Sequence, residues 1–157
     1  MRLDALPLLV AGPLLQYALP LLWPHVDRHG GLEMARAIVL YGATLGFLLI
    51  NRRHAGAWLV LAGACGNALA TLSSGGRMPV ALSALRRFPA HAVAALAAGG
   101  FGAHGPMVHP AGVGWLGDVL ASPAPLPPEA MSVGDIFIGC GLAVFLAAGM
   151  RARLPEP

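Results

Sequence analysis

The chain has 157 residues, of which 57% are hydrophobic and only 11% are charged. Soluble domains carry about 25% charged residues, so this composition argues against an ordinary soluble protein and predicts helices surrounded by lipid. All ten basic residues are arginines, scattered in ones and twos between apolar runs, which argues against a basic face that binds nucleic acid.

Four apolar stretches are long enough, or nearly so, to cross a bilayer, which takes about 20 residues. They cover residues 5–23, 35–50, 57–72 and 133–150. The first contains Pro7, Pro13 and Pro20, so we expect a kinked helix there. The sequence therefore predicts an all-α integral membrane bundle of about four transmembrane helices, forming a single domain over residues 1–157.

Residues 73–132 separate the third and fourth helices and are rich in proline. Pro79 and Pro89 each suit the first turn of a short helix, and Gly99 with Gly100 would end the second one. We expect two short interfacial helices followed by an irregular loop on the membrane surface. Whether residues 80–99 lie on the membrane or dip into it stays open.

The arginine positions predict the orientation of the chain. The turn at 51–54 and the segment at 151–153 hold the tightest arginine clusters, and four spans place both on one side. We therefore expect both termini in the cytoplasm and residues 73–132 outside.

Polar side chains at membrane depth are costly, so they are functional candidates. Three stand out: Asn67 in the third helix, Asp118 in the loop, and Asp135 in the first turn of the last helix. A purely structural interpretation exists, in which Ser132 caps the last helix and Asp135 complements its dipole. Alternatively, the proline-rich loop brings the two aspartates together, and they act as base and acid on a water and a carbonyl, as in aspartyl peptidases.

Two further groups could support such a site. Arg77 follows two glycines that predict a turn, and it is expected to pair with Asp118, Asp135 or a lipid phosphate. His104 and His109 lie five positions apart in a Gly/Pro loop and are candidates for a metal site, although solvated loop histidines are the ordinary case. No cofactor is expected.

Part of this pattern resembles signal peptidase II, a four-span bacterial aspartyl peptidase. The third helix reads G-A-C-G-N at 63–67, a loop aspartate follows, and S-V-G-D-I at 132–136 opens the last helix. The resemblance implies that Asp118 and Asp135 are the catalytic pair and that Asn67 orients the site. The chain departs from that family after Asn67, where A-L-A replaces Asp-Arg, and it has no lysine.

A broader likeness covers about residues 40–150. The segments G-G-R-M-P-V at 75–80, L-G-D at 116–118 and S-V-G-D at 132–135 resemble an uncharacterised family of small bacterial multispan membrane proteins. This resemblance implies a location in the bacterial inner (cytoplasmic) membrane, and it implies no activity.

The sequence leaves several functions open. The chain could be an intramembrane aspartyl peptidase-like hydrolase with a membrane-anchored peptide as its substrate. It could instead be a non-catalytic subunit or an assembly or stabilising factor of a larger membrane complex, bound to partner membrane subunits. A small transporter is the third hypothesis, although few polar residues line any helix and no inverted repeat is visible.

Overall fold

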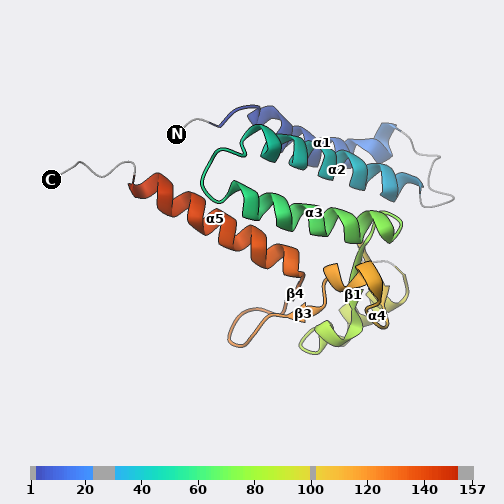
Figure 1. Ribbon diagram of the computed structural model, residues 1–157. Coiled ribbons are helices and arrows are strands. Elements are labelled where there is room, and N and C mark those ends of the chain that lie inside the picture. Colours follow the sequence, from blue (N-terminus) through green and yellow to red (C-terminus); the bar gives the residue numbers. More distant parts are fainter. Residues whose placement is uncertain (1–2, 23–30, 100–101, 152–157) are drawn as a thin grey trace.

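The computed structural model describes residues 3–22, 31–99 and 102–151, which are mostly helical. Four helices lie side by side and alternate in direction (Figure 1): α1 (Leu6–Leu22), α2 (Gly31–Ile50), α3 (Ala57–Ser73) and α5 (Val133–Arg151). Helix α1 packs on α2, α2 on α3, and α3 on α5. The order of these helices in space therefore follows their order along the chain.

Two of these helices, α2 and α5, are long and apolar enough to cross a membrane, whereas α3 and the first part of α1 are shorter apolar helices. Large apolar side chains are exposed on all four, among them Leu14, Ile38, Trp58 and Leu146. The predicted bounds agree with the helix ends to within one residue, except that α2 begins at Gly31 rather than at 35.

An ion pair lies in the first turns of α2. Arg36 Nη1 lies 3.0 Å from Glu33 Oε1, one helical turn away, so the two charges compensate each other within the first turns. The buried Glu33 and the half-buried Arg36 can therefore stay in a helix that is otherwise apolar.

The helices are joined by two kinds of contact. Between α2 and α3, a small apolar core contains Phe47, Leu48, Leu61 and Ala64. Between α3 and α5, glycines let the backbones approach closely, because a Cβ added at Gly63 would overlap the α5 backbone.

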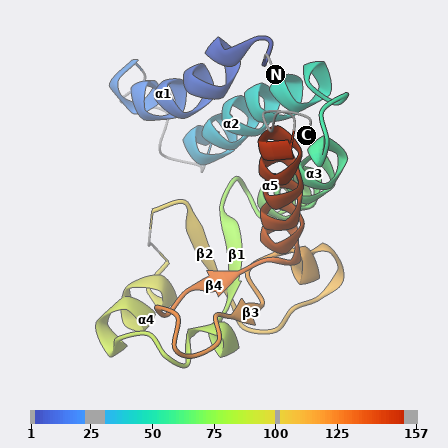
Figure 2. The same cartoon turned by 90° about the vertical axis from the view of Figure 1, so that its left-hand side faces the viewer.

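Residues 74–132 form a small folded unit, called the 74–132 unit below, at the end of the row where α3 ends and α5 begins (Figure 1). Its strands make two sheets of two strands each, a parallel pair and an antiparallel pair (Figure 2). Its elements are β1 (Met78–Ala81), η2 (Leu82–Leu85), α4 (Ala90–Ala97), β2 (His104–Met107), η3 (Gly112–Leu116), β3 (Leu120–Ala121) and β4 (Ala130–Met131).

The registers of these sheets connect segments that are distant in sequence. In the parallel pair, Met78 of β1 lies opposite His104 of β2. In the antiparallel pair, Leu120 of β3 lies opposite Met131 of β4. The unit also has an apolar core of its own, formed by Val80, Leu85 and Leu96.

The expectation of an irregular loop in this segment was therefore wrong, and the expected helix at Pro79 was wrong as well. Pro79 lies in β1, where its carbonyl accepts the Asp118 N–H at 2.9 Å while Ala81 N–H donates to the Asp118 carbonyl at 3.0 Å. The ladder does not use a donor at position 79, so proline is tolerated there. The helix after Pro89 does form as α4, and Gly99 follows it with a φ of 95°.

Candidate functional site

A cavity of about 540 Å³, called the polar cavity below, lies where α2, α3 and the start of α5 meet the 74–132 unit. Carboxylates are prominent in its lining. The charged and hydrogen-bonding side chains around it are Glu33, Arg36, Tyr41, Asn67, Thr71, His104, Asp118, Glu129 and Asp135.

At one wall of this cavity, Ser132 and Asp135 cap the start of α5 reciprocally. Asp135 N–H donates to Ser132 Oγ at 2.9 Å, and Ser132 N–H donates to Asp135 Oδ2 at 2.8 Å. This is a capping box, with aspartate in the position usually held by glutamate or glutamine. It holds the Asp135 carboxylate in the first turn of α5.

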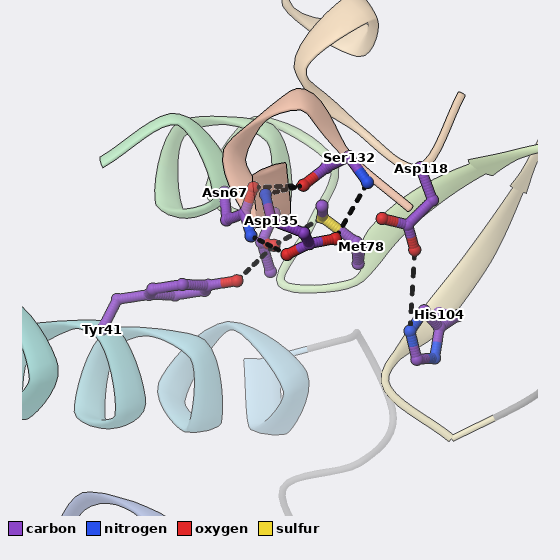
Figure 3. A network of polar contacts seen from close by, with 8 residues as sticks. Tyr41, Asn67, Met78, His104, Asp118, Ser132 and Asp135 are labelled. Atoms are coloured by element: carbon purple, nitrogen blue, oxygen red, sulfur yellow. Dashed lines mark hydrogen bonds and ion pairs between the residues drawn. The ribbon is translucent and has the colours of Figure 1, made fainter. Parts of the chain in front are cut away.

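Asn67 of α3 joins this cap and closes a ring of hydrogen bonds (Figure 3). Ser132 Oγ donates to Asn67 Oδ1 at 2.8 Å, and Asn67 Nδ2 donates to Asp135 Oδ1 at 2.8 Å. The Ser132 residue is 0% exposed. Both oxygens of Asp135 therefore accept a hydrogen bond, and its carboxylate is fixed relative to α3 as well as to α5.

Gly134 makes this ring possible. A Cβ at position 134 would overlap the Asn67 side-chain oxygen and lie 2.7 Å from the Gly63 carbonyl oxygen. No real side chain fits at that separation, so the Asn67 amide reaches the cap only because residue 134 is glycine.

Asp118 is positioned by backbone contacts rather than by contacts of its carboxylate. Its backbone bridges to Val80 of β1, and Gly117 allows the close approach because a Cβ there would overlap the Pro79 carbonyl oxygen. Asp118 is 6% exposed, and no hydrogen bond to its carboxylate is formed within the described residues. The side chain that faces its carboxylate is His104, whose Nε2 lies 3.8 Å from Asp118 Oδ2 (Figure 3).

This environment changes the acidity of Asp118. Burial, and after it the negative charges of Asp135 and Glu129, raise the pKa of the Asp118 carboxyl to about 7. At neutral pH the group is therefore present both as the acid and as the carboxylate, and it can accept or release a proton.

A second row of polar contacts crosses the cavity from α2 to β1. Thr71 Oγ1 donates to Met78 Sδ at 3.3 Å, and Tyr41 Oη lies 3.2 Å from Thr71 Oγ1. Either hydroxyl can be the donor in the contact between Tyr41 and Thr71. This row fixes the Tyr41 hydroxyl at the wall of the polar cavity.

The structure brings together most of the residues that the sequence singled out. Asn67, Asp118 and Asp135 line the same cavity. No hydrogen bond between the two carboxylates is formed in the described part of the chain, where Asp135 is bound to Asn67 and Ser132 instead.

The expected pairing of Arg77 with Asp118 or Asp135 is not formed among the described residues, whereas its pairing with a lipid phosphate stays a prediction. Arg77 Nη1 donates to the Gly99 carbonyl at 2.6 Å, and the residue lines a different cavity. His109 also lines that cavity and not the polar one, which His104 lines, so the structure places the two histidines at different cavities. Among the residues described, no group of three or more His, Cys, Asp or Glu side chains is placed to hold a metal ion.

Sequence reasoning missed Glu33, Tyr41, Thr71 and Glu129. A signal for the first two was present, because Glu33 and Tyr41 lie eight positions apart and so share one face of α2. Thr71 lies one turn after Asn67 on α3, which is the same kind of signal. Glu129 follows a proline pair in a loop, and no local pattern connects it with the other residues.

A family of unknown function (DUF5317) matches the chain over residues 1–147. No curated protein and no solved structure matches it.

Proposed function

This chain belongs to the family of unknown function DUF5317, and we propose that it is a membrane hydrolase that cleaves peptide bonds at the polar cavity. In this proposal Asp118 transfers the protons and Asp135 sets its electrostatic environment. The substrate is a membrane-anchored peptide, and no cofactor takes part.

The membrane placement in this proposal has all four long helices crossing the bilayer of the bacterial inner membrane. Helices α1 and α3 have 17 residues each, which corresponds to about 25 Å of a hydrocarbon core of about 30 Å. Exposed leucines on every helix support a lipid environment. The turn between α2 and α3 and the end of α5 lie away from the 74–132 unit (Figure 1). The turn contains Arg52 and Arg53, and α5 ends at Arg151, which supports a cytoplasmic location for that end.

One observation carries the proposal. Asp118 is buried at the wall of a polar cavity, its carboxylate has no hydrogen bond among the described residues, and its pKa is about 7. A carboxylate that serves only structure is normally held by hydrogen bonds, as Asp135 is. A group whose pKa lies near the working pH suits proton transfer in both directions.

The proposed reaction uses Asp118 twice. Its carboxylate takes a proton from a water molecule, and the water oxygen bonds to the carbonyl carbon of the peptide. The C–N bond then breaks, and the proton on Asp118 passes to the departing nitrogen. Asp135 is a positioning residue, because its fixed charge acts on Asp118 through space, and His104 at 3.8 Å faces the same carboxylate.

The test compares variants of the full chain reconstituted in lipid nanodiscs and mixed with solubilised membrane proteins from cells that lack it. New peptide amino termini are counted by mass spectrometry. We expect Asp118→Asn to slow their formation at least about 100-fold. The exposed Asp4, at the opposite end of the helix row, supplies the matched control Asp4→Asn, which should cleave like the wild type.

If the wild type produces no new termini, or if Asp118→Asn produces them at the wild-type rate, the hydrolase proposal is wrong. The chain is then better explained as a non-catalytic subunit or assembly factor that binds partner membrane subunits.

A further inference from the structure

Another cavity, of about 260 Å³ and separate from the one at Arg77, lies in the 74–132 unit and shares a wall with the polar cavity. Its own lining is apolar, formed by Val80, Leu85, Phe88, Ala92 and Leu96 together with Pro128. We call it the apolar cavity. The residues common to both cavities are His104, Asp118, Glu129 and Ala130.

The apolar cavity is large enough for a bulky side chain. A cavity of about 150 Å³ lined by apolar residues holds a benzene molecule, and this one is larger. Because Asp118 lies at the common wall, an apolar group in this cavity would place the adjoining polar part of the same molecule beside Asp118. The pair of cavities therefore suits an amphipathic molecule.

Strand β4 contributes Ala130 to the same wall. Ser122 N–H donates to the Glu129 carbonyl at 2.9 Å, and Ala121 lies opposite Ala130. This register makes Ala130 a non-hydrogen-bonded position of the antiparallel pair, so its own N–H and C=O point away from β3. Within the described residues β4 pairs only with β3, which leaves that edge of Ala130 free.

A free strand edge beside a side-chain cavity is the arrangement by which proteins bind extended peptides. A lipid acyl chain would fill the apolar cavity equally well, but it has no groups to pair with the Ala130 N–H and C=O. Glu129 and Asp118 at the common wall also disfavour an acidic side chain. These features favour a peptide with a bulky apolar residue.

We infer that the two cavities bind an extended peptide segment along the free edge of β4, with one bulky apolar side chain in the apolar cavity. The inference rests on the proposed function, because it places the scissile bond beside Asp118. It adds to the proposed function a preference for peptides with a bulky apolar residue.

The experiment measures peptide binding to the Asp118→Asn chain in nanodiscs, so that cleavage does not interfere. The probes are fluorescent, blocked heptapeptides of Ser and Gly with a single central Phe, Leu, Ala or Asp. We expect the Phe and Leu peptides to bind at least about tenfold more tightly than the Ala peptide, and the Asp peptide to bind most weakly.

Two variants, each with a matched control, locate the bound peptide. Ala92→Phe fills the apolar cavity and should weaken binding of the Phe peptide at least about tenfold, whereas Ala94→Phe, at an exposed position of the same helix, should not. Ala130→Pro removes the free N–H and should weaken binding of every peptide. Ala121→Pro removes the corresponding N–H at the opposite edge of the pair and should have no effect.

Equal binding of the Phe and Ala peptides, or normal binding by the Ala92→Phe chain, would overturn the inference. Selective binding without any cleavage by the wild type would leave the peptide site standing and remove the hydrolase proposal. Cleavage that depends on Asp118 but not on the size of the central side chain would support the hydrolase proposal and remove the inference about the apolar cavity.

Discussion

Replacing Ser132 with Ala should destabilise the start of α5 more than a typical surface substitution would. Ser132 Oγ accepts the Asp135 N–H and donates to Asn67 Oδ1, and the residue is fully buried. Losing a helix N-cap costs about 1 kcal/mol, and leaving the Asn67 oxygen without its donor costs about 1–3 kcal/mol. We therefore expect a loss of about 2–4 kcal/mol in the free energy of unfolding.

The assay is thermal unfolding of the full chain in one detergent, followed by circular dichroism. For a chain of this size, 1 kcal/mol corresponds to about 2–4 °C in Tm, so the Tm should fall by between about 4 and 16 °C. Ser73→Ala is the matched control, because the exposed Ser73 hydroxyl donates only to the Ala70 carbonyl one turn earlier. Its Tm should stay within about 2 °C of the wild type.

A double-mutant cycle with Asn67→Ala tests the reason for the loss. Since Asn67 and Ser132 share a hydrogen bond, their effects should be non-additive by about 0.5–3 kcal/mol. The reasoning is refuted if Ser132→Ala behaves like Ser73→Ala, or if the two substitutions add without coupling.

Three other predictions concern Gly134, Arg87 and Asp118. Gly134→Ala should cost about 1–3 kcal/mol of unfolding free energy by forcing α5 away from α3. Its control is Gly139→Ala, which should cost little because no atom lies within 4 Å of the added Cβ. Equal losses of unfolding free energy in the two variants would contradict the close packing of α3 on α5. Arg87→Ala should speed hydrogen exchange across residues 120–131, because Arg87 donates to the Ser122 and Leu126 carbonyls at 2.9 Å. The control is Arg86→Ala at an exposed position, and equal exchange rates in the two variants would count against this role of Arg87. Because the Asp118 pKa is raised in the folded chain, folding favours the protonated carboxyl, and this contribution to stability is complete below about pH 4 and is lost as the pH rises through about 7. Asp118→Asn should therefore unfold at a higher temperature than the wild type at pH 8. A lower Tm for Asp118→Asn at that pH would contradict the raised pKa.

The helices were predictable from the sequence because each depends on a local run of apolar residues. The one boundary that was missed is the start of α2, which lies four residues before the predicted residue 35. The predicted helix already contained Arg36, and the added first turn contains Glu33, which pairs with Arg36.

The 74–132 unit was not predictable in the same way, because its strands pair residues that are far apart in sequence. Pro79 and its neighbours carry no local sign that His104 and Asp118 will lie on either side of them. The same limit explains Arg77, which donates to the carbonyl of Gly99 after α4 rather than pairing with an aspartate.

The candidate site was predictable from the sequence only in part. Asp118, Asp135 and Asn67 were singled out because polar residues are rare in the apolar runs, and they do line one cavity. The capping role of Ser132 beside Asp135 was visible in the sequence, and the structure forms that cap. The sequence did not show that Asn67 joins the cap, nor that Asp118 is buried with no hydrogen bond to its carboxylate among the described residues.

The central claim is that Asp118 exchanges a proton near neutral pH, and its direct test is the titration of that one carboxyl group. Infrared difference spectra of the full chain in nanodiscs, wild type minus Asp118→Asn, isolate its protonated carbonyl band as the pH changes. We predict a midpoint of about 7. A midpoint at the ordinary aspartate value of about 4 would show that Asp118 is ionised throughout the neutral range, and it would contradict the proton-transfer role proposed for it.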